Sequence, residues 1–165
     1  MVKIRLFAAV LVCVTLLVSC SASPITYLSS LDEAAEYSVR IMYGSTELCG
    51  TLSVDGRVDG SIRNVELLVD TPTELAGVKI YRESGEWQAE LLEMRTSLGE
   101  LYEHSPVVRA LLLLDPGAVK GATLGGSYNE ISTAQATYYT DQTGLVREIR
   151  ADGITLVLDR TENVP

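Results

Sequence analysis

The amino-acid sequence predicts a mainly β (α+β) domain, an antiparallel meander of short strands with one short buried helix. Two observations carry this prediction. Apolar and polar residues alternate over much of the chain, as in the run 37–41 (Tyr-Ser-Val-Arg-Ile), and this period of two is typical of strands with one buried face. The segment 107–114 is instead apolar at nearly every position. A helix that is apolar all round has to be buried.

The elements follow one another in a simple order. A short helix is expected at residues 28–36, before the first strand. Turn residues such as Asp55-Gly56, Ser84-Gly85 and Asp152-Gly153 separate the alternating segments, because these residue types favour tight turns. The strands are expected at residues 37–43, 48–54, 62–69, 78–82, 86–93, 133–140, 145–150 and 154–159.

The apolar helix has clear boundaries in the sequence. Ser105 is a good N-cap, and Pro106 suits the first helical position. Asp115-Pro116 ends the segment. At about two turns this helix is too short to cross a bilayer, which needs about 20 residues. We therefore expect it to pack against the sheet.

The first 20 residues have the layout of a bacterial lipoprotein signal peptide. Lys3 and Arg5 form a basic start, and an apolar run over residues 6–18 follows, as in secretory signals. The run ends in the four lipobox residues, which are Leu17, Val18, Ser19 and Cys20. This pattern predicts cleavage before Cys20 and a covalent diacylglyceryl group on its thiol, with no other cofactor. An uncleaved helix is the alternative interpretation.

These features divide the chain into four parts. Residues 1–19 are the expected signal peptide, and residues 20–35 hold the lipidated cysteine, a tether and the short helix. Residues 36–160 are expected to form a single β-rich domain, and residues 161–165 are a tail. Two acyl chains anchor a protein stably to a bilayer. The expected location is the extracytoplasmic face of a bacterial membrane, the outer membrane if the host has one.

The charge of the chain limits its partners. The formal net charge is −9 at pH 7. An acidic domain is repelled by nucleic acid and by anionic lipid surfaces, so no nucleic-acid partner is expected. The bilayer is contacted through the N-terminal lipid anchor alone.

From its order of parts, the chain resembles small surface lipoproteins of the Gram-positive type and the LolA/LolB/LppX-like group. The stretch from Pro72 to Val78, with the pattern P-x-x-L-x-G-apolar, carries most of this resemblance. The hairpin Thr143-Gly144-Leu145 near the end adds to it. The resemblance implies a curved antiparallel meander, an open half-barrel that wraps around helices and leaves an apolar cavity.

Residues that would carry catalysis are scarce. His104 is the sole histidine in the sequence and lies in a polar stretch, and no Gly-x-Ser-x-Gly nucleophile motif is present. Cys49 is the single cysteine after the lipobox, on the polar side of its strand, so no Cys/His zinc pattern exists. We therefore expect no catalytic residue, no metal site and no enzyme activity.

Two functions remain open from the sequence. The first is a non-enzymatic binding module for an apolar or lipidic ligand held between sheet and helix. The second is a structural or protein-interaction lipoprotein of the cell envelope, with a filled core, an envelope protein as partner and no ligand. The candidate pocket-lining residues for the first function are Leu67, Trp87, Val108, Leu111 and Leu112.

Overall fold

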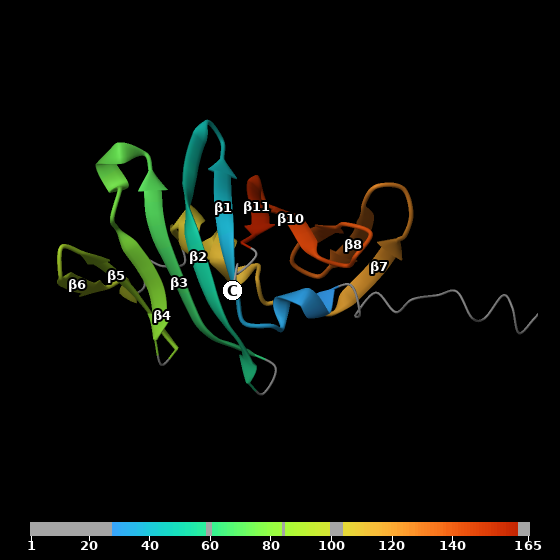
Figure 1. Cartoon of the computed structure of the whole chain (residues 1–165), viewed down its shortest axis with the longest axis horizontal. Coiled ribbons are helices and arrows are strands. Elements are labelled where there is room, and N and C mark those ends of the chain that lie inside the picture. The colour runs from blue at the N-terminus through green and yellow to red at the C-terminus, as the bar shows by residue number, and fades with distance from the viewer. Residues whose placement is uncertain (1–27, 59–60, 84, 100–103, 162–165) are drawn as a thin grey trace, which may run out of the picture.

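A computed structural model describes residues 28–58, 61–83, 85–99 and 104–161 of the chain. Its strands form one 11-stranded sheet in the order β6-β5-β4-β3-β2-β1-β11-β10-β9-β8-β7. Every neighbouring pair is antiparallel. Figure 1 shows the twist of this open sheet, with β6 and β7 at opposite sides. The expected signal peptide, with Leu17, Val18, Ser19 and Cys20, lies outside the described residues.

Two meanders make up the sheet. The first runs outward from the centre through β1 (Ala35–Tyr43), β2 (Thr46–Val58), β3 (Ser61–Thr71), β4 (Lys79–Glu83), β5 (Glu86–Leu91) and β6 (Met94–Ser97). The second returns inward through β7 (Val119–Thr123), β8 (Asn129–Thr133), β9 (Thr137–Thr140), β10 (Val146–Ala151) and β11 (Ile154–Arg160). Strand β11 pairs with β1, where Val39 faces Leu158. The first and the last strand in the sequence therefore lie side by side at the middle of the sheet.

Helix α3 (Pro106–Leu112) links the two meanders and packs against β1 and β11. It appears in gold behind the central strands in Figure 1. The Ser105 side chain caps it, since the Val108 amide donates to Ser105 Oγ at 3.4 Å. We call the sheet face that the helix covers the inner face. The predicted cap and the burial of this segment are confirmed, with Val108, Ala110 and Leu111 buried.

The inner face forms one continuous apolar core. The core includes fully buried side chains from both meanders, among them Leu52, Leu67, Ile149 and Leu156. At Gly50 the strands β2 and β3 approach so closely that a Cβ atom would lie 2.2 Å from the Leu68 carbonyl oxygen. The mainly β fold with one short buried helix, predicted from the period-two pattern, is confirmed. None of the helices within the described residues has the length and apolar character needed to cross a bilayer.

The helix expected at residues 28–36 is wrong in most of its length. The structure has a single 3₁₀ turn, η1 (Ser29–Leu31), and β1 already begins at Ala35, opposite Val54. Strand pairing overrides the local helix propensity here. The buried Leu31 and the hydrogen bond from the Val146 amide to Ser30 Oγ hold the turn against the sheet.

Three strand boundaries also differ from the predictions. The turn expected at Asp55-Gly56 is wrong, because β2 continues to Val58 and Asp55 pairs with Asn64 on β3. The strand expected at residues 133–140 is wrong in its first half, because β8 (Asn129–Thr133) ends at Thr133 and β9 begins at Thr137. Strands β7 and β8 themselves were not predicted. Thr133 Oγ1 accepts hydrogen bonds from the amides of Gln135 and Ala136 and so closes a turn between β8 and β9.

The strand expected at residues 86–93 ends at Leu91. The chain then turns at Leu92 and Glu93, which both have positive φ. It returns as β6. Another short 3₁₀ turn, η2 (Thr73–Leu75), lies between β3 and β4.

Candidate functional site

The five predicted pocket residues belong to the region between helix and sheet. Leu67, Trp87, Val108 and Leu111 are members of the core, each at most 6% exposed. Leu112 packs against this core and is half-buried. The structure thus brings all five to the inner side of the sheet. Their contact with a ligand stays a prediction.

A groove with a volume of about 500 Å³ opens beside α3 and includes Leu112 in its wall. Its floor is apolar, with half-buried Leu113 and Ala151 and the buried Ile154. Sites for small molecules have volumes of roughly 300–1,000 Å³ and mostly apolar linings. Its lining comes from α3 and the residues after it (Arg109, Leu112, Leu113, Asp115), from the β8–β9 turn (Ala134, Gln135) and from the β10–β11 hairpin (Ala151, Asp152, Ile154).

Hydrogen bonds fix the walls of this groove. The Tyr138 hydroxyl, on β9, donates to the Leu113 carbonyl oxygen at 2.7 Å and ties the end of the helix to the sheet. Thr133 Oγ1 accepts from the Gln135 amide at 3.2 Å and from the Ala136 amide at 3.1 Å. A groove with fixed walls loses little conformational entropy when a ligand binds.

Charged side chains mark the rim of the groove. Arg109 Nη2, on α3, lies 3.2 Å from Asp152 Oδ2 in the β10–β11 turn, so this ion pair joins two walls. The Arg109 side chain is 37% exposed and that of Asp152 is 82% exposed. Asp115 forms a separate ion pair, in which its Oδ2 lies 3.9 Å from Nη1 of Arg82 on β4. An apolar floor below charged groups suits an amphiphile.

Most residues that line this groove could not be identified from the sequence. Arg109, Ala134, Gln135 and Ala151 carried no signal in it, and Asp152 was noted as a turn residue only. Their meeting depends on two hairpins that are brought beside the helix by the order of the strands. Leu112 was predicted as a pocket residue from the all-apolar helix, and Leu113 belongs to the same apolar segment.

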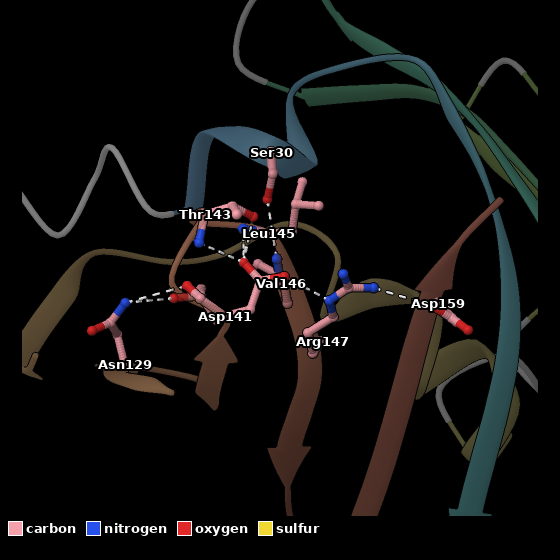
Figure 2. A network of polar contacts seen from close by, with 9 residues as sticks. Ser30, Asn129, Asp141, Thr143, Leu145, Val146, Arg147 and Asp159 are labelled. Atoms are coloured by element: carbon pink, nitrogen blue, oxygen red, sulfur yellow. Dashed lines mark hydrogen bonds and ion pairs between the residues drawn. The ribbon is translucent and has the colours of Figure 1, made fainter. Parts of the chain in front are cut away.

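A polar network lies at the other end of β10 (Figure 2). Asp141 Oδ1 accepts hydrogen bonds from the Thr143 and Leu145 amides, and Asp141 Oδ2 binds Arg147 Nε at 2.8 Å. Burial raises the pKa of Asp141, but these hydrogen bonds, including one from the Thr143 hydroxyl, outweigh it and lower the pKa. Arg147 also pairs with Asp159 on β11. The network fixes the β9–β10 turn and offers no open acid or base.

The outer face of the sheet, opposite the helix, has a second hollow of about 510 Å³. Tyr128 and Tyr139 line it, and the Arg150 guanidinium lies 4.9 Å from the Tyr139 ring centroid. Arg150 also pairs with Glu148. This hollow is separated from the groove by the sheet itself, and its ion pair provides a control for experiments on Arg109.

The residues considered for catalysis are apart from the groove lining. His104 is exposed just before the helix, and Cys49 is half-buried on β2 with its Sγ 3.6 Å from a Glu47 carboxylate oxygen. Within the described ranges, no three His, Cys, Asp or Glu side chains gather in a way that could hold a metal ion.

The fold is thus an open antiparallel sheet with a helix on its inner face. Several solved structures are similar to it at low sequence identity. The lipoprotein LppX of Mycobacterium tuberculosis is 13% identical, with a TM-score of 0.41 over 86% of this chain and 93% of that chain. A LolA superfamily protein of Nitrosomonas europaea is 8% identical, with a TM-score of 0.37 over 86% and 93%. LprF of Mycobacterium bovis is 8% identical, with a TM-score of 0.38 over 88% and 96%.

All three similarities are at 13% sequence identity or less. No family model matches the sequence. No curated protein matches it either.

Proposed function

We propose that the chain is a membrane-anchored extracytoplasmic lipoprotein whose domain is a non-enzymatic binding module for one apolar or amphiphilic ligand. The groove beside α3 carries this proposal, because the half-buried Leu112 and Leu113 present apolar surface in its lining. Burying apolar surface contributes roughly 25 cal/mol per Å². An apolar ligand seated on this floor gains that contribution, and no group in the wall is arranged for chemistry on it.

The sequence supports the anchor. The lipobox at Leu17 to Cys20 follows a basic start and a short apolar run, and a diacylglyceryl group on Cys20 gives stable attachment to a bilayer. The domain is then held on the extracytoplasmic face of the membrane, the outer one if the host has two. Its ligand reaches the groove from the membrane surface or from the surrounding fluid.

A substitution that fills the groove tests the proposal. Ala134 is exposed in the groove wall, so Ala134→Trp fills the space without disturbing the core. In the full-length protein, we expect this variant to lose binding of the neutral apolar dye N-phenyl-1-naphthylamine, followed by dye fluorescence. Ala122→Trp is the matched control, since Ala122 is exposed on β7 away from the groove lining. Equal dye binding in both variants would remove the groove as the site.

The second candidate function, a protein-interaction lipoprotein without ligand, is favoured by the filled core. Leu67, Trp87, Val108 and Leu111 occupy the space between helix and sheet with at most 6% exposure. Under this alternative, dye binding stays at background in the wild type, in Ala134→Trp and in Ala122→Trp. Crosslinking on intact membranes then recovers one reproducible envelope protein. The dye experiment and the crosslinking together separate the two functions.

A further inference from the structure

We infer that the ligand of the groove is a single-chain amphiphile with a zwitterionic head group, one that carries a phosphate and an ammonium. This inference rests on the proposed binding function and names the ligand class for the same groove. The pattern of charge on the rim supports it, together with the size of the floor.

The rim complements both signs of charge. Among the described residues that line the groove, the charged ones are the guanidinium of Arg109 and the carboxylates of Asp115 and Asp152. Asp115 is already paired with Arg82, so an anionic head group gains Arg109 but meets the Asp152 carboxylate, and a cationic head group meets the Arg109 guanidinium. A zwitterion avoids both conflicts, since its phosphate accepts from Arg109 while its ammonium donates to Asp152. Hydrogen bonds between charged partners are the stronger kind.

The existing ion pair is able to open for such a ligand. Asp152 lies in the exposed β10–β11 turn, and 82% of its side chain is accessible to solvent. Exposed ion pairs contribute little to stability, so parting Arg109 from Asp152 costs little when each gains a partner of opposite charge. Asp115 stays beside Arg82, 3.9 Å away, so Asp152 is the carboxylate of the rim that is left for the ammonium.

The size of the groove favours one acyl chain. Its volume of about 500 Å³ lies in the lower half of the range of small-molecule sites. The apolar floor is formed by four side chains, those of Leu112, Leu113, Ala151 and Ile154. One tail covers this floor, with the head group at the charged rim beside the helix.

The test compares three probes with the same acyl chain on the full-length protein in a non-ionic maltoside detergent. The probes are lysophosphatidylethanolamine (zwitterionic), lysophosphatidylglycerol (anionic) and a monoacylglycerol (neutral), and native mass spectrometry measures the occupancy of each. We expect the zwitterionic probe to bind about tenfold more tightly than the other two, a difference of about 1.4 kcal/mol.

Two variants are expected to change the affinity for the anionic probe in opposite directions. A purely structural role of the Arg109–Asp152 ion pair would not produce this difference. Arg109→Gln should lower the affinity for the zwitterionic and the anionic probe. Asp152→Asn should lower the affinity for the zwitterionic probe and raise it for the anionic one. Binding of the neutral probe should stay unchanged in both. Arg150→Gln, which breaks the Arg150–Glu148 pair on the outer face, is the matched control and should change none of the three affinities.

The outcomes separate this inference from the proposed function. If the anionic or the neutral probe binds as tightly as the zwitterionic one, the head-group class is overturned and the binding function stands. If none of the three probes binds the wild-type protein, the binding function itself fails, and the inference fails with it.

Discussion

The hydroxyl of Tyr138 donates a 2.7 Å hydrogen bond to the carbonyl oxygen of Leu113 and so fastens the end of helix α3 to strand β9. Tyr138 itself is fully buried. The bond satisfies one of the carbonyl groups that a helix leaves unpaired at its C-terminal end. It also fixes Leu113 in the wall of the groove, so the stability of the fold and the shape of the site depend on the same contact.

Tyr138→Phe removes this bond and leaves the Leu113 carbonyl without that donor. This bond is partly buried, and a typical hydrogen bond contributes about 0.5–1.5 kcal/mol. We expect a loss of that size in the free energy of unfolding, measured by urea denaturation. Tyr128→Phe is the control, because Tyr128 is 57% exposed and its change should stay within about 0.5 kcal/mol. Equal losses for both variants would contradict this role of Tyr138.

Leu111→Ala tests how well the inner face is filled. Leu111 is 2% exposed within the core, and truncating a buried leucine costs about 2–5 kcal/mol because a cavity remains. Thermal or urea unfolding measures this loss. Leu92→Ala serves as the matched control, since Leu92 is 82% exposed. A loss below about 1 kcal/mol for Leu111→Ala would contradict a filled core and indicate a space already present around this residue.

Gly50→Ala tests the close approach of β2 and β3. Its Cβ atom would lie 2.2 Å from the backbone oxygen of Leu68, and a backbone atom in a central pair of strands has little room to shift. Overpacking costs about 1–3 kcal/mol, and more where the neighbour is rigid. Gly121→Ala on the edge strand β7, where no atom lies within 4 Å, is the control. Comparable urea midpoints for the two variants would contradict the predicted clash.

Asp141 predicts a pH dependence of stability. Its pKa is lowered because hydrogen bonds to the charged carboxylate outweigh the effect of burial, which raises it. A carboxyl whose pKa is lower in the folded state stabilises the fold fully above its unfolded pKa of about 3.9. That contribution is lost as the pH falls through the folded pKa. The wild type is thus expected to lose its advantage over Asp141→Asn on acidification, in melting temperatures measured from pH 6 to pH 2. A parallel loss in both proteins would contradict this role.

The sequence predicted most of the elements through local signals. The alternation in β1 and β11 identified their buried faces, and Ser105-Pro106 located the start of the helix. The boundaries that failed depend on how neighbouring strands pair, which the local residue types do not reveal. Asp55 lies in a strand because Asn64 pairs with it, whereas its local context with Gly56 favours a turn.

The groove could not be predicted for the same reason. Arg109 and Asp152 are 43 residues apart in sequence and meet because β11 pairs with β1, next to which α3 lies. The alternation of apolar and polar residues shows which side chains share a face of the sheet. It does not show which strands are neighbours. Ala134 and Gln135 line the groove only because they lie in the β8–β9 turn. The sequence predicted a continuous strand at these two residues.

The most direct test of the central claim is a comparison of two masses of the full-length protein extracted from bacterial membranes. Denaturing mass spectrometry gives the chain with its covalent groups, and native mass spectrometry adds whatever is bound without a covalent bond. A native mass larger by one lipid-sized ligand in the wild type, and not in Ala134→Trp, is the predicted result. Equal native and denaturing masses of the wild type would contradict a ligand-binding module and favour the filled-core, partner-binding alternative.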